Sequence, residues 1–211
     1  MKFLSKLEAR WAHSNSLLCV GLDPQLDRIP DRFKKQNSPY LDFCTAIVDA
    51  THELVCCFKP QAAYFSAVGA EDQLEKLVLY IKEQHPDIPV ILDAKRGDIG
   101  STAALYAKEA YERYGADAVT VNPYLGFESI EPYMKYEDKG IVVLCRTSNP
   151  GSDWLQKDKN DSVPVYQRVA KQVADWNKED QFVLVTGATY PEELGEVRKI
   201  VGRMPLLVPG I

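Results

Sequence analysis

The chain has 211 residues, 45% of them hydrophobic, and a formal net charge of −5. This length predicts one domain over residues 1–211 with a sizeable core. Because acidic and basic residues are interspersed, the charge argues against nucleic acid or an acidic membrane surface as the main partner. A local pocket can still bind a small anion.

The five cysteines favour a reduced cytoplasm as the setting of the protein. Four of them lie in apolar runs, where cysteine acts as a small buried hydrophobe. There is no C-x-x-C motif and no Cys/His spacing suited to zinc. The N-terminus lacks a signal-peptide core, and no apolar run approaches the ~20 residues that span a bilayer.

Short apolar runs alternate along the chain with longer amphipathic segments, as the helical spacing of apolar residues in 74–81 illustrates. Ser38 is the expected N-cap of the first helix, and Gly115 is expected just past the end of the third. In chain order, the expected elements are strand 17–22, helix 39–54, strand 54–58, a helix over 74–81 that stops before Pro86, strand 89–92, helix 101–114, strand 118–121, a short helix at 129–136, strand 141–145, helix 164–178, strand 182–185, helix 191–201 and strand 206–208.

This order of elements predicts an α/β protein with a parallel sheet covered by helices. A doubly wound sheet and a (β/α)8 barrel both have it. The two commonest nucleotide-binding fingerprints of open sheets, G-x-G-x-x-G and G-x-x-x-x-G-K-[ST], do not occur. Polar residues follow nearly every strand, at the end where a barrel gathers its active site. The residues at these strand ends are Asp23, Lys59, Asp93, Lys95, Asn122, Arg146 to Asn149, Thr186, Gly187, Pro209 and Gly210.

A lysine lies between two aspartates just after the third strand. Asp93 and Lys95 are two apart in a segment expected to be extended, so both side chains should leave the same side of the sheet. Gly97 allows a turn that brings Asp98 back toward Lys95. One interpretation is a surface ion-pair network, which would contribute roughly 0–1 kcal/mol to stability.

The other interpretation is catalytic. Neighbouring carboxylates favour the charged ammonium, whereas a Schiff-base lysine must be a free amine. The ammonium also occupies the place that a metal ion would take between the acids. Lys95 is therefore suited to give a proton to a developing carbanion, as in a decarboxylation followed by protonation.

The stretch LDAKRGDIGSTAALYA (92–107) resembles the D-x-K-x-x-D signature of the orotidine 5′-phosphate decarboxylase family, in its longer bacterial form with DAKRGD. Five further stretches resemble the family's other strand-end motifs in the same order: VGLDP (20–24), FKPQ (58–61), VNPYLG (121–126), RTSNPG (146–151) and VPGI (208–211). The resemblance covers essentially the whole chain. It implies a (β/α)8 TIM barrel that converts orotidine 5′-phosphate to UMP in de novo pyrimidine biosynthesis, with no metal and no cofactor.

For the reacting end of the substrate, the resemblance implies four residues. Lys95 would protonate C6 of the pyrimidine, and Asp93 would lie beside the substrate carboxylate and orient Lys95. Asp98 would complete the charged array in the active site of the neighbouring subunit of a homodimer. Thr102 would cross the same interface; considered alone, it is equally well a helix-start residue.

For the remainder of the nucleotide, the resemblance implies five residues. Asp23 and Lys59 would hold the ribose hydroxyls, although polar residues at strand ends are also explained by solvation. Ser148 would hydrogen-bond the pyrimidine; considered alone, it is a turn residue. Pro209 and Gly210 would begin the loop that grips the phosphate with backbone amides, where a bare Pro-Gly otherwise indicates only a turn.

The family continues past the point where this chain ends, with a glycine-rich phosphate loop and an eighth strand and helix. We therefore expect a barrel whose eighth βα unit is missing from the 211 residues. Two alternatives to the decarboxylase remain open. One is a related sugar-phosphate barrel decarboxylase that uses magnesium, such as one acting on keto-gulonate phosphate. The other is a non-catalytic, nucleotide-binding relative.

Overall fold

The computed structural model describes residues 1–160 and 162–210, and its chain divides into two compact units. The first unit comprises Met1–Ala94 and Ala104–Val119, and the second comprises Lys95–Ala103 and Thr120–Ile211. Ile211, the last residue of the VPGI stretch, lies outside the described residues. The prediction of a single domain over residues 1–211 stays a prediction.

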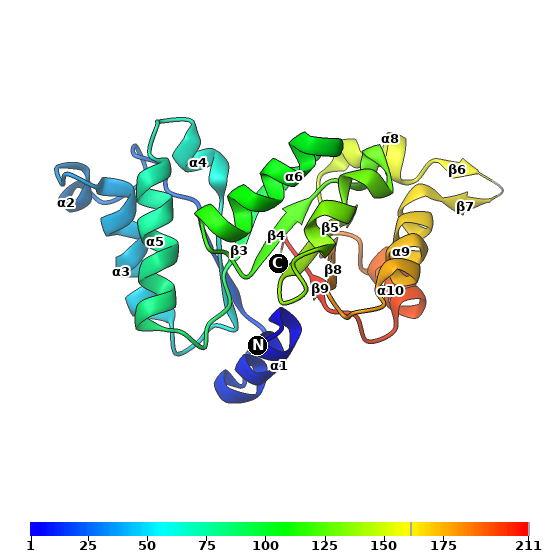
Figure 1. The fold of residues 1–211 in the computed structure, drawn as a ribbon, viewed down its shortest axis with the longest axis horizontal. Helices are drawn as coiled ribbons and strands as arrows, with labels where there is room; N and C mark the ends of the chain where they lie inside the picture. Colours follow the sequence, from blue (N-terminus) through cyan, green and yellow to red (C-terminus); the bar gives the residue numbers. More distant parts are fainter. Residues whose placement is uncertain (161, 211) are drawn as a thin grey trace. The chain divides into compact units, whose positions relative to one another are not determined.

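The first unit contains two paired strands and most of the N-terminal helices (Figure 1). Strand β1 (Cys19–Leu22) pairs in parallel with β2 (Cys57–Pro60), with Leu22 opposite Pro60. Parallel bridges from Phe58 to Val90 and from Gln61 to Asp93 place the β2 segment beside the start of β3 (Ile91–Arg96). The helices are α1 (Phe3–Ser14), α2 (Asp31–Lys34), α3 (Pro39–Thr51), α4 (Ala62–Ser66) and α5 (Glu71–Gln84).

A buried arginine fastens helix α1 to the rest of this unit. The Arg10 guanidinium donates from Nε to the Val55 carbonyl (2.9 Å) and from Nη1 to Asp87 (2.8 Å), and it also donates to the His52 carbonyl. These acceptors lie in the connections that lead into β2 and β3. Because an arginine has several N–H donors in a fixed planar arrangement, one side chain can hydrogen-bond acceptors in both connections.

The second unit contains a sheet with the strand order β3-β4-β5-β8-β9, to which β3 and β4 (Ala118–Val121) contribute their C-terminal residues. Strand β5 (Gly140–Arg146) pairs in parallel with β8 (Phe182–Thr186), and β8 pairs in parallel with β9 (Leu206–Leu207). All residues of β4 and β8 are buried, as expected for parallel strands covered on both faces.

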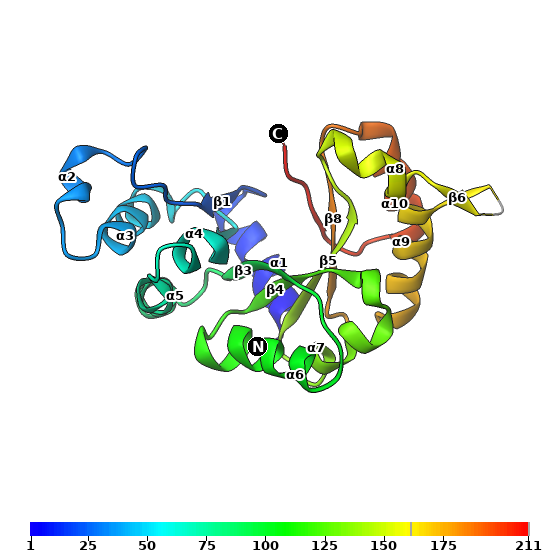
Figure 2. The same cartoon turned by 90° about the horizontal axis from the view of Figure 1, so that it is seen from above.

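Two long helices of the second unit pack against each other, and Figure 2 shows both on one side of β5 and β8. They are α9 (Val165–Trp176) and α10 (Pro191–Val201). A short antiparallel hairpin of β6 (Lys159–Asn160) and β7 (Val163–Pro164) projects from this unit. The remaining elements are α7 (Glu131–Met134), α8 (Asp153–Gln156) and the 3₁₀ turns η2 (Pro123–Leu125), η3 (Phe127–Ser129) and η4 (Pro150–Ser152).

Each of the seven predicted strands is present, and the helices predicted to begin at Pro39 and Pro191 begin there. Several details of the prediction were wrong. The second strand starts at Cys57 rather than at residue 54, and Ser38 makes no side-chain capping bond. The helix predicted over 101–114 divides into α6 (Gly100–Lys108) and the π-helical η1 (Glu109–Arg113). Gly115 follows with φ +66°, as a left-handed helix terminus requires.

Helix α1 and the short helices α2, α4 and α8 were not predicted. In α1 only Phe3, Leu7 and Arg10 are buried, so an arginine takes the third position of its inward face and weakens the apolar pattern. Among the described residues, no helix combines the length and the apolar character needed to cross a membrane.

Candidate active site

In the first unit, a buried carboxylate lies at the centre of a polar cluster. Asp93 on β3 is 5% exposed, and its Oδ2 accepts from the Lys59 ammonium (3.0 Å) and from Gln61 Nε2 (3.1 Å). Both donors come from β2 and the residue after it. The parallel register brings them to Asp93, because Gln61 is its bridge partner. A buried carboxylate needs such partners to remain charged.

Two carboxylates act on Lys59. Burial lowers the pKa of Lys59, but the negative charges of Asp93 and Asp23, with the hydrogen bond to Asp93, outweigh that effect and raise it above 10.5. Asp23 follows β1 directly, is exposed, and would touch a side chain added at Gly21, at 3.5 Å. The first unit therefore holds a fixed cation among two carboxylates at the C-terminal ends of three neighbouring strands.

In the second unit, the backbone at Lys95 is left-handed, with φ +47°. Such a conformation costs a residue with a Cβ roughly 1–2 kcal/mol. The prediction that Asp93 and Lys95 leave the same side of the sheet assumed an extended backbone at both residues, and this step was wrong at Lys95. The backbone N–H of Lys95 donates to Thr120 Oγ1 on β4 (2.9 Å).

The other two predicted residues of this segment lie just before helix α6 and in its first turn. Asp98 caps its own loop, since its Oδ1 accepts from the Ile99 N–H (2.8 Å). Thr102 is exposed in the first turn of α6. A turn was predicted at Gly97. The left-handed backbone conformations of this segment occur instead on either side of it, at Lys95 and Gly100, where φ is positive. Gly97 instead lies close to Asn122, which a Cβ at position 97 would approach to 3.3 Å.

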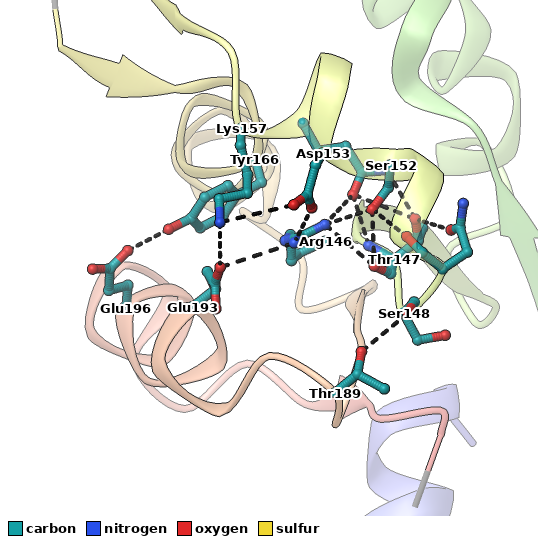
Figure 3. A network of polar contacts seen from close by, with 12 residues as sticks. Arg146, Thr147, Ser148, Ser152, Asp153, Lys157, Tyr166, Thr189, Glu193 and Glu196 are labelled. Carbon is teal, nitrogen blue, oxygen red and sulfur yellow. Dashed lines mark hydrogen bonds and ion pairs between the residues drawn. The ribbon is translucent and has the colours of Figure 1, made fainter.

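Ser148 lies at a crowded junction of three strand ends in the second unit. A Cβ at Gly187 would come within 2.7 Å of the Cα and Cβ of Ser148, so only glycine fits there without a shift. Thr189 Oγ1 donates to the Ser148 carbonyl (3.1 Å; Figure 3), and the Ala188 N–H donates to the Pro209 carbonyl (2.9 Å). A Cβ at Gly210, where φ is +89°, would contact Ser148 at 3.5 Å. The structure therefore brings Ser148, Pro209 and Gly210 together.

Arg146 organises the loop that carries Ser148. Its side chain is fully buried, and it pairs with Asp153 at 2.6 Å and with Glu193 at 3.9 Å (Figure 3). Its guanidinium also lies 3.6 Å from the centre of the Tyr190 ring. These partners belong to the loop and helix after β5 and to the segment after β8. Arg146 therefore connects two successive strand-end segments, and one of them carries Ser148.

The predicted residues fall into both units, with Asp23, Lys59 and Asp93 in the first and Lys95, Asp98, Thr102, Ser148, Pro209 and Gly210 in the second. Gln61, Thr120, Gly187 and Thr189 were not singled out as functional. Gln61 belongs to the FKPQ stretch and Gly187 follows the sixth predicted strand, so the sequence marked both positions; nothing in the sequence marked Thr120 or Thr189. Within the described residues, no group of three or more His, Cys, Asp or Glu side chains could hold a metal ion.

Two of the cavities that lie within single units are larger than 700 Å³. One of about 740 Å³ in the first unit is lined largely by apolar residues such as Leu26, Tyr40 and Val68. The other, of about 1020 Å³ in the second unit, is lined by aromatic residues that include Trp154 and Trp176. None of the nine predicted residues is among the described linings of these cavities, so the candidate site rests on the strand ends.

Comparison with known proteins identifies one family. The model of the orotidine 5′-phosphate decarboxylase / HUMPS family matches residues 16–211. An orotidine 5′-phosphate decarboxylase of Ralstonia pickettii is 58% identical over 212 residues, covering 100% of this chain and 78% of the relative. One from Janthinobacterium is 56% identical with the same coverage.

Solved structures agree with the sequence relatives. The structure of Leishmania donovani OMP decarboxylase matches with a TM-score of 0.90 and 39% identity, over 100% of this chain and 80% of that one. The Leishmania donovani UMP synthase structure matches with the same TM-score and 40% identity, over 100% of this chain and 45% of that one. The parallel α/β fold described above is thus of the TIM-barrel class, as predicted.

We expect Asp93→Asn to lower the pKa of Lys59, because it removes the main negative charge that opposes the effect of burial. Since the pKa of Lys59 in the folded protein is raised above 10.5, its contribution to stability should be complete below that pH and lost as the pH rises through the folded value. NMR titration of the labelled lysine side chains measures the shift. Asp72→Asn, at the exposed pair with Lys76, is the control and should leave Lys59 unchanged.

We expect Gly187→Ala to reduce the free energy of unfolding by about 1–3 kcal/mol, because its methyl group would collide with Ser148. Urea denaturation measures the effect. The matched control is Gly195→Ala on α10, where an added Cβ meets nothing within 4 Å. The control should raise stability by up to about 1 kcal/mol. Equal effects of the two substitutions would contradict the crowding at Ser148.

Proposed function

The chain belongs to the orotidine 5′-phosphate decarboxylase / HUMPS family, and on that premise we propose that it decarboxylates orotidine 5′-phosphate to UMP in de novo pyrimidine biosynthesis. The observation that carries the proposal is the match over all 211 residues to relatives of 56–58% identity that bear this one name. The DAKRGD stretch adds a lysine suited to the proton transfer that the reaction needs.

Lys95 is the proposed proton donor. The bond from C6 of the pyrimidine to the carboxylate breaks, carbon dioxide leaves, and the electron pair remains at C6. The Lys95 ammonium then gives its proton to C6, and solvent protonates the resulting amine. The reaction consumes one proton and requires no redox partner and no cofactor. A positioned cation acts here both as the acid and as stabilisation for the charge that develops at C6.

Asp93 is the proposed neighbour of the substrate carboxylate. Its ion pair with Lys59 and its hydrogen bond from Gln61 support this role, because they keep a buried carboxylate charged. A fixed negative charge beside the substrate carboxylate favours a step in which that group departs as neutral carbon dioxide.

The proposed binding residues come from the two groups described above, the cluster around Asp93 and the junction at Ser148. Lys59 and Asp23 would hold the ribose hydroxyls as donor and acceptor, and the raised pKa of Lys59 keeps its ammonium charged at neutral pH. Ser148 would hydrogen-bond the pyrimidine, while the backbone at Pro209 and Gly210 would contact the phosphate. The closeness of Ser148 to Gly210 supports one ligand reaching both. Contacts to the unreactive parts of a substrate can supply energy used at the reacting carbon.

We further propose a homodimer in which Asp98 and Thr102 contribute to the active site of the partner subunit. The exposure of Thr102, at the start of α6, leaves it available for such a contact. We place the enzyme in the cytoplasm, which is consistent with five free cysteines among the described residues.

The decisive test is the loss of orotidine 5′-phosphate, followed by absorbance with EDTA present, in the wild type and in Lys95→Ala. We expect wild-type turnover that is insensitive to the chelator and a loss of many orders of magnitude in the variant. Lys76→Ala, at an exposed ion pair on α5, is the control and should retain wild-type activity. Equal rates for the wild type and Lys95→Ala would refute the role of Lys95, and inhibition by EDTA would favour a magnesium-dependent relative.

Mixing two inactive variants tests the shared active site. We combine Lys95→Ala with Asp98→Asn, which keeps an oxygen that can accept from the Ile99 N–H. At equal amounts, about half of the dimers are mixed, and each mixed two-fold dimer holds one site with both native residues. About a quarter of the wild-type activity should therefore return. Subunit exchange is followed with a mass label, and exchange without recovered activity would contradict sharing.

A further inference from the structure

Lys95 has an unusual backbone conformation for a lysine in a strand. Four non-glycine residues of the described chain have positive φ: Asn15, Lys95, Ser162 and Asp180. Asparagine and aspartate adopt this conformation more readily than other residues, because their short side chains bond the local backbone. Lysine is not one of these residues, so the surroundings of Lys95 must hold the conformation.

A side chain of the neighbouring strand stabilises this conformation. The hydroxyl of Thr120, on β4, accepts a hydrogen bond from the Lys95 N–H at 2.9 Å, and Thr120 is only 1% exposed. In a regular parallel ladder, a backbone carbonyl would accept from this amide. Backbone pairing resumes directly afterwards, where the Asn122 N–H donates to the Arg96 carbonyl at 2.7 Å.

The hydroxyl therefore replaces a backbone acceptor at a strand residue that has left the extended conformation. Without it, the Lys95 N–H would lose this partner, and a backbone rotation at Lys95 could seek another acceptor. That rotation would turn the Cα–Cβ bond of Lys95 and move its ammonium. Thr120 is thus linked to the direction of the side chain on which the chemistry depends, although it belongs to a different strand.

We propose that Thr120 is a positioning residue for Lys95, which it holds in the left-handed conformation that aims the ammonium at the reacting carbon. The inference rests on the proposed function, because it takes Lys95 as the proton donor. It assigns no contact between Thr120 and the substrate. Loss of the hydroxyl should therefore impair the proton-transfer chemistry and leave binding through Asp23, Lys59 and Ser148 largely intact.

The chain offers a matched control for removal of this hydroxyl. Thr186, at the end of β8, is 0% exposed, and its Oγ1 has no hydrogen-bond partner within the described structure. Thr120→Val and Thr186→Val are the same nearly isosteric change at two buried strand ends of one sheet. They differ in whether the hydroxyl accepts a bond from a backbone amide. Thr120→Ser keeps that acceptor while removing a methyl group.

The test compares kcat and KM for orotidine 5′-phosphate, and inhibition by UMP, in the wild type and these three variants. Misplacing a catalytic group by about 1 Å can cost on the order of 100-fold in rate. We expect Thr120→Val to lower kcat by roughly that factor. Inhibition by UMP should change less than about twofold, Thr120→Ser should recover most of kcat, and Thr186→Val should lower kcat far less than Thr120→Val. Wild-type kcat in Thr120→Val, or equal loss in both valine variants, would overturn the proposal.

A second measurement separates this inference from the proposed function and from failure to fold. Hydrogen exchange of the Lys95 amide in the wild-type protein reports the bond to Thr120 without any need for activity. Exchange at the rate of an unstructured amide would overturn the proposal, and protection that is lost in Thr120→Val or Thr120→Ala would support it. If the wild type does not turn over orotidine 5′-phosphate, the proposed function fails while this measurement still decides the contact.

Discussion

The ion pair between Asp93 and Lys59 is the constraint on which the first unit depends. A carboxylate that is almost excluded from water stays charged only if cations and donors reach it, and here they come from β2. They can do so because β2 runs parallel to the start of β3 with Gln61 opposite Asp93. A shift of one residue in this register would turn both donors to the other face of the sheet.

The second unit brings its predicted residues together by close packing rather than by charge. The backbone at Gly187 approaches Ser148 so closely that no side chain fits between them, and Gly210 packs against the same serine. The buried Arg146 also joins the segments that follow β5 and β8, through Asp153 and Glu193. Removal of one of these partners would leave a buried charge uncompensated, which is strongly destabilising.

These features agree with an enzyme that works with fixed charges. Membership of the family indicates the reaction that the chain catalyses. The geometry indicates how the side chains of such a site are held in place. Asp93 is held by ionic partners, Ser148 by steric contact, and Lys95 by a strained backbone hydrogen-bonded to a neighbouring strand. Preorganisation of this kind reduces the reorganisation needed as charge develops during the reaction.

The sequence by itself determined the order of strands and helices, the family, and the residues at the strand ends, because these depend on local periodicity and on motifs that are contiguous in the chain. It did not reveal helix α1, whose inward face includes Arg10, or the π-helical turn after α6. Only the tertiary structure showed that Gln61 partners Asp93, that Gly187 makes room for Ser148, and that Thr120 accepts from Lys95. Each of these contacts joins residues at least 25 positions apart, so its formation depends on strand register and not on any local pattern.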